Sequence, residues 1–162
     1  MVQQSHQPAA VQAAVAYAAL TAAHEVGDYL IQRDADAKAK GQHGPAGAAA
    51  CARHVASYTA TQALALYAAD RYLRLGLTWR RAAAGLTLSA ITHYAADRCN
   101  GHWTNGEGDG APLLVRAAYA AGKGGWLAHD PAAGPLLDQA WHKGWIGLAA
   151  LIAAGPRPPS GR

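Results

Sequence analysis

The chain has 162 residues, a formal net charge of +4 and a hydrophobic content of 51% with no phenylalanine. This length is enough to bury the core of one domain and too short for two large ones. The small positive charge identifies no partner, although it permits an anionic small molecule, a nucleotide or a nucleic acid. Alanine, the best helix former, dominates the composition, which favours an all-helical protein whose helices approach closely.

The cysteines, the start of the sequence and the charges in its apolar stretches argue against a cysteine zinc site, export and membrane insertion. Cys51 and Cys99 lie in no CxxC or other zinc-type spacing, so we interpret them as reduced core thiols of a cytosolic protein. The start of the sequence lacks the basic and apolar regions of a secretory signal, so we expect no export. The longest apolar stretches contain charges such as Glu25 and Asp138, so we expect no integral membrane segment. A cytoplasmic location, with peripheral membrane association left open, is the expectation.

Apolar residues recur at helical spacing in five segments, and we predict a helix in each. The predicted helices span residues 8–32, 45–76, 79–98, 112–121 and 135–154. The connecting segments RDADAKAKGQHGPAG, NGHWTNGEGDGAP and GKGGWLAHDPAAG are rich in Gly, Pro or charge and are predicted to be loops, the second of them a lid near the site. The sequence thus predicts one all-α domain, residues 1–154, built as a bundle of four to five helices, with a disordered tail at 155–162.

Three predicted helices each carry a histidine and an aspartate four residues apart. Side chains at this spacing lie on one helix face and can bind a common cation or each other. Each pair falls among small apolar residues, where an uncompensated carboxylate or imidazole is costly to bury. If the three faces converge on the bundle axis, the pairs form one metal site. Its predicted ligands are His24, Asp28, His93, Asp97, Asp138 and His142.

Imidazole nitrogen and carboxylate oxygen ligands suit one or two divalent transition-metal ions, with zinc or manganese preferred. Such an ion lowers the pKa of a bound water and polarises a phosphoryl or carbonyl oxygen, so hydrolysis is the natural reaction class. A carboxylate that is spared from metal binding can act as general base, which makes Asp28, Asp97 and Asp138 the catalytic candidates. The residues expected to orient a ligand, a water or the substrate are Gln32, His54 and Gln139.

The segments AHEVGDYLIQ, THYAADR and LLDQAWHKG, with a histidine in the intervening helix, resemble the small helical bacterial and phage family named domain of unknown function 3307. The resemblance runs from about residue 20 to 147, and H-x-x-G-D-[YF]-L-x-Q and D-Q-x-x-H carry it. That family is more distantly similar to membrane-associated metal-dependent hydrolases with H-x-x-x-D helices. The resemblance implies a site made of the three His/Asp pairs, with Gln32 and His54 nearby.

We therefore interpret the chain as a metal-dependent hydrolase, with a phosphoester or nucleotide as the favoured substrate because the chain is basic and the resemblance points the same way. Two alternatives stay open at this stage. The chain can be a metal-free base-excising enzyme or DNA-binding module, with Trp141 and Trp145 stacking on a base. It can also be a non-catalytic interaction protein whose buried His/Asp pairs only hold helices together.

Overall fold

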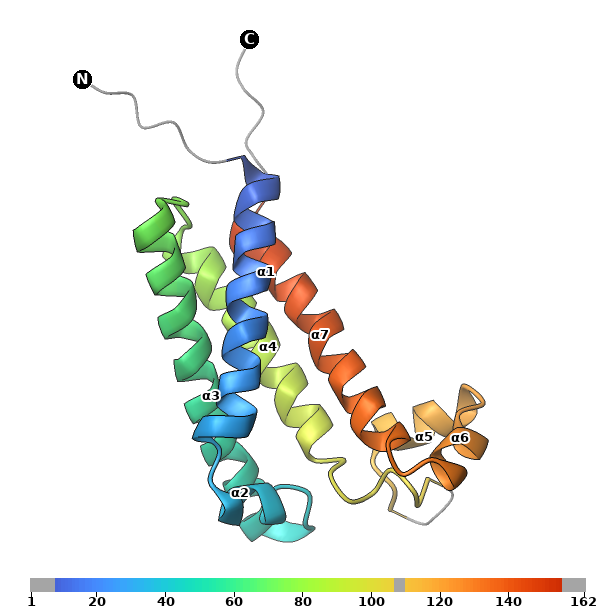
Figure 1. The fold of residues 1–162 in the computed structure, drawn as a ribbon. Coiled ribbons are helices and arrows are strands. Elements are labelled where there is room, and N and C mark those ends of the chain that lie inside the picture. Colours follow the sequence, from blue (N-terminus) through green and yellow to red (C-terminus); the bar gives the residue numbers. More distant parts are fainter. Residues whose placement is uncertain (1–7, 107–109, 156–162) are drawn as a thin grey trace, which may run out of the picture.

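The computed structural model describes residues 8–106 and 110–155, and the regular secondary structure within these residues is entirely helical (Figure 1). The elements are α1 (Ala9–Val26), the π-helical turn η1 (Gly27–Ile31), α2 (Asp34–Ala39), α3 (Gly44–Leu73), α4 (Trp79–Asp97), α5 (Leu113–Ala120), α6 (Gly124–His129) and α7 (Ala133–Ala154). The all-α fold predicted from the sequence is confirmed.

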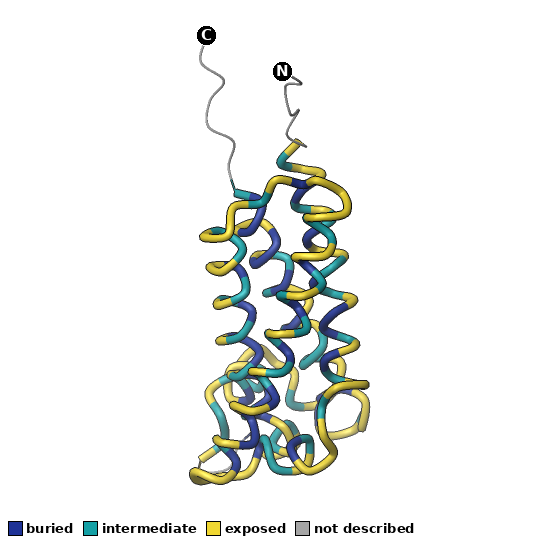
Figure 2. The backbone as a smooth tube through the Cα atoms, turned by 90° about the vertical axis from the view of Figure 1, so that its left-hand side faces the viewer, coloured by how far each residue is buried: buried dark blue, intermediate teal, exposed yellow. Residues whose placement is uncertain are grey.

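The four long helices α1, α3, α4 and α7 form the bundle. Helix α1 packs against α3 and α7, and α4 packs against the same two neighbours. The four run alternately down and up in Figure 1, so that α1 begins and α7 ends at the same end of the bundle. The short helices α2, α5 and α6 lie at the opposite end, and in Figure 2 the buried backbone faces the interior between the long helices.

Small residues let the helices approach closely. A Cβ atom on Gly85 of α4 would lie 2.4 Å from the backbone oxygen of Ala149 in α7, so this contact requires glycine. Larger side chains fill the space on either side of the close contact, with Leu20, Leu66 and Ile146 almost fully buried in one cluster. This is the close helix packing that the alanine-rich composition predicts.

Two segments that we predicted to be loops contain short helices. Helix α2 lies in RDADAKAKGQHGPAG and is tied down by Asp36, whose carboxylate accepts hydrogen bonds from Arg33 and Arg53. Helix α6 lies in GKGGWLAHDPAAG, and Asp130 just beyond it accepts a hydrogen bond from the indole of Trp126. Each helix has six residues and no long apolar stripe, so tertiary contacts rather than local pattern stabilise it.

The Gly-rich loop after α4 lies beside the site, as predicted, because residues 100, 101, 103 and 104 line a cavity that Asp97 and Asp138 also line. Residues 107–109 of this loop and 156–162 of the predicted tail fall outside the described residues. Cys51 and Cys99 are buried thiols, and burial raises the pKa of Cys51 to about 12 and that of Cys99 to about 11, which keeps them protonated. In the described parts of the chain, no helix is long and apolar enough to cross a bilayer.

Candidate metal centre

The first His/Asp pair lies where α1 changes into the π-helical turn. His24 is in the last turn of α1 and is fully buried, and its Nδ1 lies 3.5 Å from Oδ2 of Asp28 in η1. The π turn is closed by the N–H of Gln32, which donates to the backbone oxygen of Gly27 over 2.9 Å. Single π turns inserted in α-helices occur frequently at functional sites.

The second pair, His93 and Asp97, lies in the last turns of α4, and His54 approaches it from the middle of α3. The Nε2 atoms of His54 and His93 are 3.0 Å apart. Oδ2 of Asp97 lies 3.3 Å from the first of these atoms and 3.2 Å from the second. Oδ1 of Asp28 lies 3.3 Å from Nε2 of His54 and 3.5 Å from Nε2 of His93. We name these four residues the core group.

Most of the spacings in the core group are those of atoms that bind a common metal ion, and ligand atoms of Asp28, His54 and His93 lie within 4.8 Å of one another. A tetrahedron with metal–ligand bonds of about 2.0–2.1 Å has edges of roughly 3.3–3.4 Å between its ligand atoms. Five of the six atom pairs in the core group are 3.0 to 3.5 Å apart. The four atoms come from three separate elements, so the tertiary fold rather than one helix brings them together.

The charge state of these residues is the state that a metal requires. Burial lowers the pKa of His24 and of His93, although Asp28 and Asp97 respectively oppose the shift. Burial raises the pKa of a carboxyl, but the close approach of His93 and of the ammonium of Lys40 outweighs it and holds the pKa of Asp97 well below its usual value. The close approach of His54 likewise lowers the pKa of Asp28 against the effect of burial. Neutral imidazoles and ionised carboxylates are the forms that bind cations.

The protein alone leaves several of these atoms without hydrogen bonds. Oδ1 of Asp28, Oδ2 of Asp97 and Nε2 of His142 are buried and have no hydrogen-bond partner among the described residues. A single Nε2–H between His54 and His93 can serve only one acceptor, yet two carboxylate oxygens also face that point. Buried polar atoms of a folded protein are normally satisfied. A cation at the centre of the core group would satisfy the oxygens of Asp28 and Asp97.

A buried polar chain fixes the orientation of His93. The ring of Tyr58 stacks on the imidazole with centroids 3.8 Å apart, and its hydroxyl is 2.9 Å from Oγ of Ser89. Ser89 in turn donates to Oε1 of Gln62, whose amide donates to the backbone oxygen of Leu20. The chain connects α3, α4 and α1, so it holds the imidazole and its helices in one arrangement.

The third pair, Asp138 and His142, lies on the second and third turns of α7. Nε2 of His142 is 3.3 Å from Oδ2 of Asp138, and its ring centroid lies 4.2 Å from that of His93. Ligand atoms of Asp97, Asp138 and His142 lie within 4.8 Å of one another, and we name these three residues the pocket-side group. His24, His93 and His142 also offer ligand atoms within that distance. The three pairs therefore converge, and the His/Asp groups can hold a metal ion.

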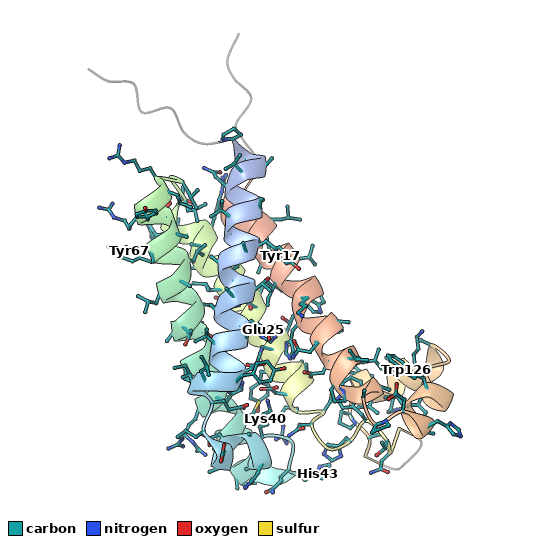
Figure 3. The ribbon with its side chains drawn as sticks, in the orientation of Figure 1. Tyr17, Glu25, Lys40, His43, Tyr67 and Trp126 are labelled. Carbon is teal, nitrogen blue, oxygen red and sulfur yellow. The ribbon has the colours of Figure 1, made fainter. Side chains whose placement is uncertain are left out.

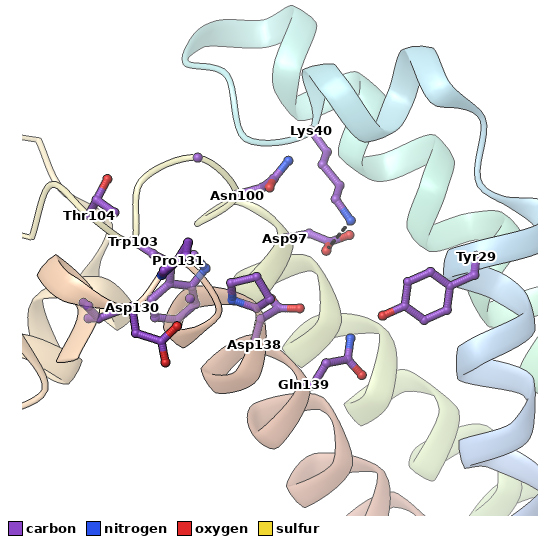
Figure 4. Close-up of a pocket in the computed structure, with 14 residues that line it drawn as sticks. Tyr29, Lys40, Asp97, Asn100, Trp103, Thr104, Asp130, Pro131, Asp138 and Gln139 are labelled. Atoms are coloured by element: carbon purple, nitrogen blue, oxygen red, sulfur yellow. Dashed lines mark hydrogen bonds and ion pairs between the residues drawn. The ribbon is translucent and has the colours of Figure 1, made fainter.

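A cavity of about 330 Å³ opens beside the pocket-side group (Figure 4). Asp97 and Asp138 reach it from α4 and α7, and the ring of Tyr29 points toward it from η1. The side chain of Asp138 is 24% exposed, whereas those of the core group are at most 9% exposed. Solvent and a ligand therefore reach the centre from this side.

Lys40, at the C-terminal end of α2, places a positive charge at the cavity wall (Figures 3 and 4). Its ammonium donates to Oδ1 of Asp97 over 2.8 Å and is largely buried, with 13% of the side chain exposed. Oδ2 of the same carboxylate faces His54 and His93. The two oxygens of Asp97 are therefore divided between the lysine and the core group.

The residues predicted to orient ligands have different positions. His54 is a member of the core group rather than a more distant helper. Gln139 lines the cavity, and its Oε1 accepts a hydrogen bond from Nε2 of His24 over 3.2 Å. Gln32 ends η1, and its amide nitrogen is buried without a hydrogen-bond partner among the described residues. Lys40 and Tyr58 were not predicted, because neither has a chemically suggestive neighbour in the sequence.

Comparisons with protein families, with curated proteins and with solved structures gave no match to this chain. The function is therefore argued from the geometry of the core group, the pocket-side group and the cavity. The resemblance stated from the sequence motifs stays a prediction.

Proposed function

We propose that the protein is a metal-dependent hydrolase that acts on a phosphoester or nucleotide. The observation that supports this most strongly is the core group, in which two imidazole nitrogens and two carboxylate oxygens are buried within 3.0 to 3.5 Å of one another in five of six pairs, and both oxygens lack a hydrogen-bond partner among the described residues. A set of mutually unsatisfied acceptors is costly to bury unless a cation binds between them.

The ligand chemistry favours zinc or manganese. Two imidazole nitrogens and two carboxylate oxygens make a borderline to hard ligand set that suits these ions better than a thiolate-preferring metal. When bound, the ion would polarise a phosphoryl oxygen and lower the pKa of a coordinated water towards neutrality. Inward His and carboxylate side chains of helix bundles are established metal sites.

Residues around the metal site have separate roles in holding the carboxylates, the water and the substrate. The core group fixes Oδ2 of Asp97, and Lys40 holds the other oxygen of that carboxylate at the cavity wall. Asp138 is the carboxylate best placed to position a water in the cavity, because it is partly exposed there and its Oδ2 contacts His142. Lys40 offers a positive charge to a substrate anion.

Neither alternative gains a specific supporting observation. A base-excising enzyme was predicted to use Trp141 and Trp145 as a stacking surface, but the indole of Trp141 donates to the backbone oxygen of Thr92, and the aromatic residues that line the cavity are Tyr29 and Trp103. A purely structural role for the pairs leaves the unsatisfied atoms of Asp28, Asp97 and His142 without explanation.

The test is the metal content of the purified, untagged protein, measured by elemental mass spectrometry. We expect one or two equivalents of a transition metal, loss of metal in His54→Ala and His93→Ala, and activity on a panel of phosphoesters that chelation abolishes. His129→Ala is the matched control, because that imidazole is exposed in α6, away from the core group, and forms a hydrogen bond with the backbone oxygen of Gly125. Circular dichroism checks that each variant is folded. No bound metal after reconstitution, with the helical fold intact, would overturn the proposal.

A further inference from the structure

The core group and the pocket-side group share Asp97 but differ in two respects that decide what a metal ion can do there. The core group offers four ligand atoms, all on side chains that are at least nine-tenths buried. The pocket-side group offers three, and two of them, Asp97 and Asp138, line the cavity, with Asp138 partly exposed there. Four protein ligands close a tetrahedral site, as in structural metal sites, whereas three leave a position open, as in catalytic sites.

We propose that the pocket-side group binds a second, exchangeable divalent cation, and that a phosphoryl oxygen of a small phosphomonoester completes its coordination from the cavity. The inference deepens the proposed function and rests on it, because the core group must first hold Asp97 in place. It also assigns different roles to the two positions: the core position stabilises the bundle, and the pocket-side position meets the substrate.

His142 provides an independent indication that a ligand belongs at the pocket-side group. Its side chain is 98% buried, and its Nε2 has no hydrogen-bond partner in the described part of the chain. That nitrogen faces Oδ2 of Asp138 at 3.3 Å. The ring lies beside those of His24 and His93, with centroids 4.9 and 4.2 Å away. A buried imidazole nitrogen that lacks a hydrogen-bond partner and lies beside a carboxylate can form a pair of metal ligands with it.

The other carboxylate at the cavity is already engaged and gives a matched contrast. Oδ1 of Asp130 accepts the backbone N–H of Ala132, and its Oδ2 accepts the indole N–H of Trp126. Asp130 thus holds the turn before α7 in place, and both of its carboxylate oxygens already accept a hydrogen bond. Within residues 8–106 and 110–155, Asp138 accepts no hydrogen bond from the backbone, and its ion pair with His142 lies near Asp97, with ligand atoms of the three within 4.8 Å of one another.

The size and charge of the cavity favour a small anion. A volume of about 330 Å³ is at the lower end of the range for small-molecule sites, which favours a phosphomonoester over a polymer. Lys40 adds its ammonium to the wall at Asp97, next to the pocket-side group. A bound cation and this lysine would together neutralise the nearby carboxylates and attract a phosphate dianion.

The first part of the experiment counts cations. Metal-free protein is titrated with Mn²⁺ by calorimetry, and bound metal is counted after gel filtration. We expect two equivalents in the parent, with the second bound at least about tenfold more weakly because it has one protein ligand fewer. Asp138→Asn should lose only the second equivalent, and Asp130→Asn, the same change of charge in the same cavity, should keep both. His54→Ala, which opens the core group, should lose the tight equivalent.

The second part tests the anion with inorganic phosphate as the probe. Phosphate should bind to the protein that holds two equivalents of Mn²⁺ and fail to bind when only the tight equivalent is present. Lys40→Met should weaken that binding about tenfold or more, and Lys40→Arg should retain most of it. If the parent and Asp138→Asn both bind a single, tight equivalent of Mn²⁺, the pocket-side cation site is overturned and the proposed function stands. No tight equivalent at all would overturn the proposed function itself.

Discussion

Among single residues, Ser89 connects the packing of the bundle with the orientation of a candidate metal ligand. Its hydroxyl bridges Tyr58 and Gln62, and Tyr58 stacks on His93. Ser89→Ala leaves the hydroxyl of Tyr58 and an amide oxygen buried without a partner, which should lower the free energy of unfolding of the metal-free protein by about 1–3 kcal/mol. Urea unfolding followed by circular dichroism measures this change.

Ser57→Ala is the control for that prediction. Ser57 lies one turn from His54 and donates only to a backbone oxygen of its own helix, so its loss should change the free energy of unfolding by no more than about 0.5 kcal/mol. Equal losses in the two variants would mean that the chain through Tyr58 and Gln62 contributes nothing beyond a surface hydroxyl.

The residues that were predicted are those whose partner lies on the same helix face. Each His/Asp pair is local, so the four-residue spacing placed both members before any tertiary contact was known. His54 and Lys40 lack that signal. Their partner Asp97 lies outside their own segments, 43 positions from His54 and 57 from Lys40 in the sequence. Only the packing of α2 and α3 against α4 determines their roles.

At the scale of elements, the π turn after α1 determines where Asp28 lies. A Cβ atom on Gly27 would lie 3.2 Å from Cδ2 of Tyr58, a ring that Ser89 and His93 hold from two sides. The ring cannot move aside freely, so Gly27→Ala should lower the free energy of unfolding by about 1–3 kcal/mol despite the better helix propensity of alanine. Thermal or urea unfolding tests this directly.

Gly144→Ala in α7 is the control for Gly27→Ala, because it is the same substitution in a helix at a position where no side chain is in the way. A Cβ atom there meets nothing within 4 Å, so alanine should raise the free energy of unfolding by about 0.5–1 kcal/mol. If Gly27→Ala is stabilising to the same degree, Tyr58 is not tightly held and the proposed ordering of His93 by its neighbours is wrong.

Elements differ in how well the sequence predicted them, for a physical reason. The long helices have an apolar face to bury, and their recurring apolar residues predict them directly. The stretch DADAKA of α2 alternates aspartate or lysine with alanine, so no stripe marks it, and contacts of Asp36 with Arg33 and Arg53 hold it in place. The π turn has no sequence signal of its own, since the same residues suit an ordinary α-helical turn.

At the scale of the whole molecule, the bundle places polar groups from α1, η1, α3, α4 and α7 in one interior region. From the sequence we predicted that the three helix faces with His/Asp pairs would form one metal site if they converge. The sequence did not predict which atoms of these residues would lie next to one another. That depends on crossing angles and helix register, which are set by close contacts such as Gly85 against Ala149. The same contacts make the core group costly without a cation, because its carboxylates are ionised and nearly inaccessible to water.

Metal binding should therefore be visible in the stability of the entire bundle. A ligand that binds only the folded state, at a free concentration of about 100 times its Kd, adds about 2.7 kcal/mol to the free energy of unfolding. For a chain of this size, that corresponds to a rise in Tm of roughly 5–11 °C. We expect this rise when zinc or manganese is added to chelated protein, measured by thermal scans at fixed pH. Asp130→Asn should show the same rise and His54→Ala almost none; a rise of equal size in both variants would place the stabilising ion outside the core group.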